Sequence, residues 1–99
     1  MANEKGKDRL KNKVAIITGA SMGLGEAIAL LFAREGAWVT VADIADEKGE
    51  ETVGQIEAEG GDATFMHVDV SQTADVERMV NATVETFGHL DILVSNVGL

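Results

Sequence analysis

The sequence contains no cysteine, no proline and no tyrosine, and it has one tryptophan and three phenylalanines among 99 residues. The absence of cysteine excludes disulfides, thiolate metal ligands and a cysteine nucleophile, and it fits a cytoplasmic protein. No apolar run is long enough to span a membrane, so we expect no membrane association. The polar residues 1–13 lack the apolar stretch of a secretory signal. What remains is typical of one soluble globular domain without a metal site.

Basic residues are scarce and unevenly placed. The net charge is −9, five of the eight basic residues lie within residues 1–13, and only Arg34, Lys48 and Arg78 follow. A fold this acidic cannot neutralise a run of phosphates, so nucleic acid is excluded as a partner. We interpret residues 1–12 as a polar, basic leader that is solvated, and residues 13–99 as the folded domain.

Hydrophobic periodicity divides residues 13–99 into alternating short apolar runs and amphipathic segments. The apolar runs predict strands at 13–18, 38–43, 63–70 and 90–96, and the amphipathic segments predict helices at 26–36, 46–60 and 74–88. Strands that alternate with helices indicate an α/β fold with a parallel sheet covered on both faces. We expect three inward faces on the helices: Ala27, Ile28, Leu31 and Phe32 on the first, Val53 and Ile56 on the second, and Val76, Met79, Val80 and Val84 on the third. Gly49 and Gly54 weaken the second helix, and Ser71 or Thr73 can cap the third.

The segment between the first strand and the first helix has two interpretations. Residues 19–23, GASMG, fit the G-x-S-x-G pattern in which Ser21 would be a nucleophile at a strand-to-helix turn. Hydrolases of that kind place several strands before this turn, and the only histidines, His67 and His89, have no evident partner. We expect His67 to be packed or hydrogen-bonded rather than catalytic. A P-loop is excluded because no Lys-Ser or Lys-Thr follows the glycines.

The same glycines suit a turn that holds a pyrophosphate. A helix N-terminus has unpaired N–H groups and the positive end of the helix dipole, and Gly19, Gly23 and Gly25 would let the backbone turn tightly and approach a ligand. Asp43 ends the second strand, 18 residues after Gly25, where a carboxylate would meet the ribose hydroxyls of a dinucleotide. The alternative is that Asp43 only caps the turn into the next helix. We favour the ribose interpretation because the turn, the βαβ unit and the acid coincide.

These motifs resemble those of the short-chain dehydrogenase/reductase family. TGASMGLG at 18–25 is similar to the family's T-G-x-x-x-G-x-G turn, HVDV at 67–70 to the end of its third strand, and SNVG at 95–98 to its N-N-A-G. Ser95 and Val97 depart from that last pattern. The resemblance implies a Rossmann-like, doubly wound parallel sheet with strand order 3-2-1-4, truncated here after the fourth strand.

The resemblance also implies a set of cofactor-binding residues. Asp69 would reach the adenine amino group, and Asp43 would accept a hydrogen bond from the 2′-hydroxyl of NAD and repel the 2′-phosphate of NADP. Met22 and Ile44 stand where NADP-binding members place an arginine, so we expect NAD to be preferred. The full set is Gly19, Ser21, Met22, Gly23, Leu24, Gly25, Asp43, Ile44, Asp69, Val70, Asn96 and Gly98.

Family members carry their chemistry in a serine and a Tyr-x-x-x-Lys pair on the fifth strand and the following helix. This sequence has no tyrosine, so we assign no catalytic residue and give Asn96 only a supporting role. We expect the NAD-binding portion of an oxidoreductase that transfers hydride between NAD(H) and a secondary alcohol or ketone. The chain alone would be inactive, and a small-molecule substrate would bind only if a C-terminal half completed the site.

Two further expectations concern association. The fourth strand would form an exposed apolar edge, with Ile92, Leu93 and Val94 beside it, and such an edge favours self-association. The alternative function is that the chain is a complete, non-catalytic nucleotide-binding or assembly module.

Overall fold

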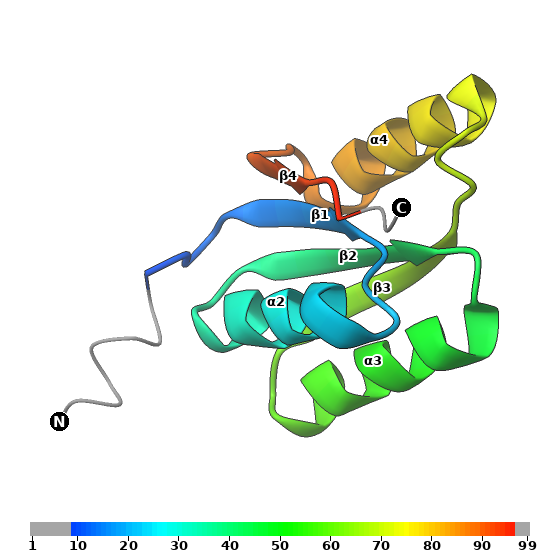
Figure 1. Cartoon of the computed structure of the whole chain (residues 1–99). Helices are drawn as coiled ribbons and strands as arrows, with labels where there is room; N and C mark the ends of the chain where they lie inside the picture. Colours follow the sequence, from blue (N-terminus) through cyan, green and yellow to red (C-terminus); the bar gives the residue numbers. More distant parts are fainter. Residues whose placement is uncertain (1–8, 97–99) are drawn as a thin grey trace, which may run out of the picture.

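The computed structural model describes residues 9–96 and forms a parallel sheet of order β3-β2-β1-β4 with helices on both faces (Figure 1). The elements are β1 (Val14–Thr18), α2 (Gly23–Arg34), β2 (Trp38–Asp43), α3 (Asp46–Ala58), β3 (Asp62–His67), α4 (Thr73–Phe87) and β4 (Ile92–Val94). In Figure 1, α2 and α3 cover one face of the sheet and α4 covers the other. The predicted fold class and strand order are confirmed.

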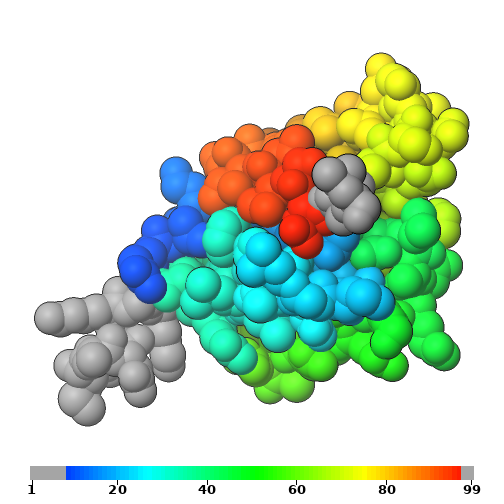
Figure 2. All heavy atoms as spheres, in the orientation of Figure 1, coloured from blue at the N-terminus to red at the C-terminus, as the bar shows by residue number. Residues whose placement is uncertain are grey.

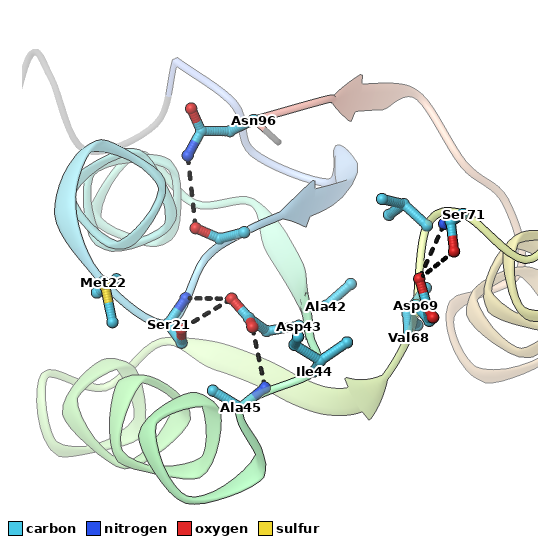
Figure 3. Close-up of a pocket in the computed structure, with 12 residues that line it drawn as sticks. Ser21, Met22, Ala42, Asp43, Ile44, Ala45, Val68, Asp69, Ser71 and Asn96 are labelled. Carbon is cyan, nitrogen blue, oxygen red and sulfur yellow. Dashed lines mark hydrogen bonds between the residues drawn. The ribbon is translucent and has the colours of Figure 1, made fainter. Parts of the chain in front are cut away.

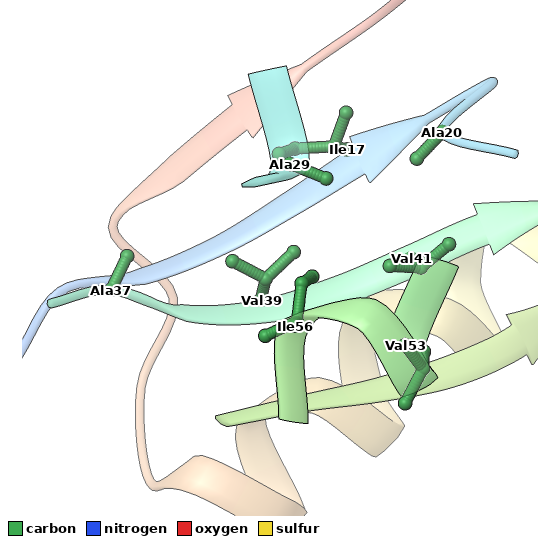
Figure 4. Close-up of a cluster of buried hydrophobic side chains, with 8 residues drawn as sticks. All are labelled: Ile17, Ala20, Ala29, Ala37, Val39, Val41, Val53 and Ile56. Atoms are coloured by element: carbon green, nitrogen blue, oxygen red, sulfur yellow. The ribbon is translucent and has the colours of Figure 1, made fainter. Parts of the chain in front are cut away.

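The central strands are buried because they carry apolar and β-branched side chains on both faces. All of β1 is buried, as are the four inner positions of β2. Ile17 points into the cluster under α2 and α3, and Ile16 into the cluster under α4. The first cluster comprises Ile17, Ala20, Ala29, Ala37, Val39, Val41, Val53 and Ile56 (Figure 4). The second comprises Ile16, Ala42, Val68 and Met79.

The inward face of α2 differs in part from the predicted one, since Ile28 and Phe32 pack against the first core cluster as predicted but Ala27 and Leu31 do not lie at its centre. Ala27 is exposed and Leu31 is 49% exposed, whereas Gly25 and Ala29 are buried. The reason is the close approach of this helix to the glycine turn: a Cβ on Gly25 would meet the carbonyl oxygen of Gly19. Small residues therefore form the innermost line of α2, and larger apolar side chains flank it. The helix also begins at Gly23 rather than at residue 26.

The other two helices show further tertiary effects. Val53 and Ile56 of α3 are buried as predicted, and Gly49 has a packing reason, because a Cβ there would overlap the ring of Phe65. In α4, Met79 is buried but Val84 is 39% exposed. Thr83 takes the buried position instead, with its hydroxyl 3.1 Å from that of Thr40, so the pair satisfies both polar groups.

The predicted cap of α4 is wrong. The N-cap residue is Gln72, and no side chain makes a capping hydrogen bond there. The hydroxyl of Ser71 donates to Asp69 instead. A side chain two residues after an aspartate is well placed for this local bond, which competes with capping.

The two outer strands are shorter than predicted. β3 ends at His67 because its partner β2 ends at Asp43, which leaves no ladder beyond that pair. Val68, Asp69 and Val70 therefore form a loop rather than the end of a strand. β4 is limited to residues 92–94, which pair with β1, and among the described residues its other edge pairs with no strand. Leu93 is 54% exposed.

The described start of the chain contacts the domain. The Arg9 guanidinium donates to both carboxylate oxygens of Glu35, at 3.1 and 2.9 Å. Leu10 packs against the first core cluster. Among the described residues, Arg9 and Leu10 thus contact the domain although they lie within the segment that we predicted to be a leader.

Candidate functional site

A cavity of about 710 Å³ opens at the carboxyl ends of the strands. It lies where the strand order reverses, because β2 and β3 extend from one side of β1 and β4 from the other. Crevices at such switch points are the usual ligand sites of parallel α/β sheets. The lining residues are Gly19, Ser21, Met22, Ala42, Asp43, Ile44, Ala45, Val68, Asp69, Val70, Ser71 and Asn96 (Figure 3).

Two glycines of the turn have positive φ for different reasons. Gly19 (φ 64°) has no room for a side chain, because a Cβ would meet the carbonyl oxygen of Asn96. Gly23 (φ 61°) faces open space, with no neighbouring atom within 4 Å of the point that a Cβ would occupy. Gly19 thus serves packing, while Gly23 leaves the start of α2 accessible to a ligand.

The first turn of α2 is available to an anion. Its N-cap residue is Met22, which makes no side-chain capping hydrogen bond. The N–H groups of Gly23, Leu24 and Gly25 precede the first possible intrahelical partner, so they have no acceptor within the helix. Together with the helix dipole they form a site suited to a phosphate.

Asp43 is held by hydrogen bonds on both carboxylate oxygens. The Ser21 hydroxyl and N–H donate to Oδ2 at 2.7 and 3.2 Å, and the Ala45 N–H donates to Oδ1 at 2.9 Å (Figure 3). Burial acts to raise the pKa of Asp43, but these hydrogen bonds outweigh it and hold the pKa below its ordinary value. The carboxylate is therefore ionised at neutral pH. The Ala45 contact is the turn-capping role that we considered as the alternative, and Asp43 fills it while also lining the cavity.

The nucleophile interpretation of Ser21 fails on geometry. Its hydroxyl donates to Asp43, and no histidine is placed to activate it. Nδ1 of His67 lies 2.6 Å from the Asp46 carboxylate, so His67 is hydrogen-bonded, as we expected. Nε2 of His89 lies 2.9 Å from Asp91. With each histidine beside a different acid, a Ser-His pair cannot form at this turn.

Asp69 resembles Asp43 in its local bonds but has a free oxygen. The hydroxyl and N–H of Ser71 donate to Oδ1, at 2.7 and 3.0 Å. The hydrogen bond from the Ser71 hydroxyl is the main cause that holds the pKa of Asp69 below its ordinary value. Within residues 9–96, Oδ2 of Asp69 accepts no hydrogen bond, and it can accept one from a ligand.

Asn96 ties the end of β4 to the glycine turn. Its N–H donates to the Thr18 hydroxyl at 2.9 Å, and its side-chain amide donates to the Gly19 carbonyl at 3.4 Å. Figure 2 shows the end of β4, in red, against the segment that leads into α2, in light blue. Asn96 thus supports the turn as well as lining the cavity.

The structure brings most of the predicted site residues together. Gly19, Ser21, Met22, Asp43, Ile44, Asp69, Val70 and Asn96 all line the cavity, and Gly23, Leu24 and Gly25 form the adjacent helical turn. Gly98 lies outside the described residues, as does Val97. The exposed apolar side chains of Met22, Ile44 and Val70 offer walls to a flat ring.

Sequence reasoning missed four lining residues: Ala42, Ala45, Val68 and Ser71. Ala45 and Ser71 each lie two residues after a site aspartate and donate to it. Aspartates make such bonds to residues two positions on, so this spacing is the signal that could have found them. Ala42 and Val68 are buried apolar residues that no chemical motif marks.

Residues 9–96 include no helix that is both long and apolar enough to cross a membrane. The same residues contain no group of three or more histidine, cysteine or acidic side chains placed to hold a metal ion.

The comparisons with known proteins agree with the fold. A family model described as short chain dehydrogenase matches residues 13–99. An uncharacterised oxidoreductase of Thermotoga maritima is 51% identical over 89 residues, which is 90% of this chain and 35% of that protein. The chain spans about a third of the length of the curated relatives it matches.

Two solved structures are close in shape. A hydroxysteroid dehydrogenase from Escherichia coli has a TM-score of 0.90 at 37% identity, covering 92% of this chain and 39% of that one. A short chain dehydrogenase from Burkholderia cenocepacia, in complex with NADP, has a TM-score of 0.88 at 39% identity, covering 93% of this chain and 38% of that one.

Proposed function

We propose that residues 13–99 form the NAD-binding part of an oxidoreductase, because the chain belongs to the short-chain dehydrogenase family. The oxidoreductase would transfer hydride between NAD(H) and a secondary alcohol or ketone. The observation that carries the proposal is the ionised Asp43 carboxylate, which lines the cavity beside an uncapped helix N-terminus. Bound NAD would supply the nicotinamide that accepts or donates hydride.

The pyrophosphate would bind at the start of α2. The open space at Gly23 allows the ligand to reach the backbone, and the free N–H groups of the first turn would donate to its oxygens. Among residues 9–96, no lysine or arginine lines the cavity, so backbone N–H groups would supply most of the hydrogen bonds to the pyrophosphate.

The ribose of the adenosine half would lie against Asp43. A carboxylate accepts hydrogen bonds from hydroxyls and repels a phosphate, so it favours NAD over NADP. The neighbouring side chains Met22 and Ile44 are apolar and cannot compensate the charge of a 2′-phosphate. The Burkholderia relative binds NADP, so the preference proposed for this chain depends on these three side chains rather than on the family.

The adenine would lie between the exposed apolar side chains of Ile44 and Val70, with its amino group toward the free oxygen of Asp69. An ionised carboxylate only accepts hydrogen bonds, so it suits an amino group. The 99 residues contain no tyrosine, and we propose that they bind the cofactor while proton transfer needs other residues. The name of the hydroxysteroid dehydrogenase relative supports an alcohol as the substrate class.

The test is calorimetric titration of the chain with NAD and with NADP. We expect NAD to bind about tenfold more tightly or better. Gly23→Ala should weaken NAD binding about tenfold, because the added methyl group enters the space that the pyrophosphate would use.

Gly60→Ala is the matched control. Gly60 also has positive φ (87°) and open space around a Cβ, but it lies between α3 and β3, outside the cavity lining. Its substitution adds the same kind of backbone strain and should leave NAD affinity unchanged. Equal affinity for NAD and NADP, or equal effects of the two glycine substitutions, would contradict the proposal.

A further inference from the structure

The loop after β3 is held from behind by a charged pair on α4. The Asp69 N–H donates to Oδ2 of Asp75 at 2.9 Å. The Arg78 guanidinium donates through Nη1 to Oδ1 of Asp75, at 2.9 Å, and through Nη2 to the carbonyl of His67, also at 2.9 Å. Arg78 therefore connects the last residue of β3 with the first turns of α4, and Asp75 passes that constraint to the backbone of Asp69.

This clamp, formed by Asp75 and Arg78, sets where the Asp69 carboxylate points. Ser71 occupies Oδ1 of Asp69, so only Oδ2 is free to contact a ligand. The direction of that oxygen depends on the backbone position of Asp69, because the side chain has few rotatable bonds. Hydrogen bonds weaken steeply when they are misaligned, so a loose loop would lose much of the contact.

We infer that Asp75 and Arg78 are positioning residues for the adenine end of the site, and that they give the chain its preference for a 6-amino purine over a 6-oxo purine. The inference rests on the proposed dinucleotide function. Neither residue lines the cavity, so both would act through Asp69 and not by touching the base.

The chemistry of the base explains why the position of one oxygen matters. Adenine presents an amino group that donates to a carboxylate, whereas hypoxanthine presents a carbonyl oxygen at the same place. A fixed carboxylate is attracted to the first and repelled by the second, and a mobile one can turn away from the carbonyl. The clamp is charged at neutral pH, because hydrogen bonds from the Asp69 N–H and from Arg78 hold the pKa of Asp75 below its ordinary value.

Arginine suits this role better than lysine. Its planar guanidinium reaches two partners at once, a carboxylate and a carbonyl, in a fixed geometry. A lysine could keep the charge opposite Asp75 but would not hold both contacts. Arg78→Lys should therefore restore only part of the function.

The experiment is calorimetry of the chain with ADP-ribose and with IDP-ribose, which carries hypoxanthine in place of adenine. The unaltered chain should prefer ADP-ribose. Arg78→Ala should weaken ADP-ribose binding about tenfold and IDP-ribose binding much less. The ratio of the dissociation constant for IDP-ribose to that for ADP-ribose should therefore fall. Asp75→Ala should reduce the same ratio, and Arg78→Lys should give an intermediate value.

Arg34→Ala is the matched control, because Arg34 also makes two hydrogen bonds to a carboxylate, that of Glu59, at 2.8 and 2.9 Å, on a surface outside the cavity lining. It should leave the ratio unchanged. Circular dichroism of each variant verifies the fold. If Arg78→Ala and Asp75→Ala both keep the ratio of the unaltered chain, the positioning role is wrong while the proposed function stands. If the unaltered chain binds neither compound, the proposed function itself fails, and the inference with it.

Discussion

Asp43 and Asp69 lie at or just after the carboxyl ends of neighbouring parallel strands, and hydrogen bonds fix the carboxylate of each. Each accepts two hydrogen bonds from one serine, and each has a pKa below its ordinary value. They differ in where the serine comes from. Ser21 is 22 positions from Asp43 and lies on the turn after β1, whereas Ser71 is two positions from Asp69 in the same loop.

This difference gives the two aspartates different roles: Asp43 connects two elements of the fold, whereas Asp69 is held within one loop. Asp43 joins the end of β2 to the glycine turn and has both oxygens hydrogen-bonded, so it helps to hold two elements of the site in register. Asp69 has one oxygen held and one free, and its orientation is set within the loop and by the clamp. We therefore expect changes at Asp43 to affect folding stability and binding together, and changes at Asp69 to affect binding alone.

The largest effect should follow Asp43→Ala. It removes the acceptor of the Ser21 and Ala45 N–H groups, which should lower the free energy of unfolding by about 1–2 kcal/mol. It also removes the proposed ribose contact, so the affinity for NAD should fall by roughly a hundredfold. Thermal unfolding and calorimetry measure the two quantities.

Asp43→Asn sharpens this result, since the amide keeps an acceptor oxygen but loses the charge. It should bring the affinities for NAD and NADP closer together. Asp62→Ala, at the exposed start of β3, is the control and should change neither quantity. A stable Asp43→Ala variant with unchanged NAD affinity would remove Asp43 from the site.

A smaller effect should follow Asp69→Ala. NAD affinity should fall about tenfold, because one hydrogen bond to the base is lost. The temperature of unfolding should change little, because within residues 9–96 the Asp69 side chain is bonded only to Ser71 in its own loop, and the bond from the Asp69 N–H to Asp75 remains. A marked loss of stability would show that Asp69, like Asp43, holds separate elements together.

How far the sequence predicts the site follows the same division between local and long-range contacts. The apolar run of β1 is followed by a glycine turn, a helix and a second apolar run that ends in an acid. This local order allowed Gly19, Gly23 and Asp43 to be placed from their spacing. Asn96 could be placed only by resemblance. The clamp could not be predicted, because Asp75 and Arg78 read as ordinary charges on an exposed helix until α4 is packed against the end of β3.

The errors in the fold have similar causes. Periodicity favours the largest apolar side chains for the core, and it selected Leu31 and Val84, which are exposed. The buried positions belong to Ala29 and Thr83. Ala29 lies one turn after Gly25, where α2 approaches the Gly19 carbonyl too closely for a side chain, and both belong to the small innermost line of that helix. Thr83 is accommodated because its hydroxyl has a partner in that of Thr40 on β2.

The smallest effects, and the most direct test of the comparison, concern the pKa values of the two carboxyl groups. Both are below the ordinary value in the folded chain, so each contributes stability that is present above the ordinary aspartate pKa of about 4 and is lost as the pH falls through the folded pKa. The hydrogen bond from the Ser71 hydroxyl is the main cause that lowers the pKa of Asp69. At Asp43 burial opposes the lowering, and the hydrogen bond from the Ala45 N–H lowers the pKa more than the bond from the Ser21 hydroxyl does. Ser71→Ala should therefore raise the pKa of Asp69 by more than Ser21→Ala raises that of Asp43, as measured by NMR titration of the carboxyl carbons. If Ser21→Ala instead raised the pKa of Asp43 by more than Ser71→Ala raises that of Asp69, the bond from the Ser21 hydroxyl would be the main cause at Asp43. The Ala45 N–H in the β2–α3 turn would then contribute less than we infer.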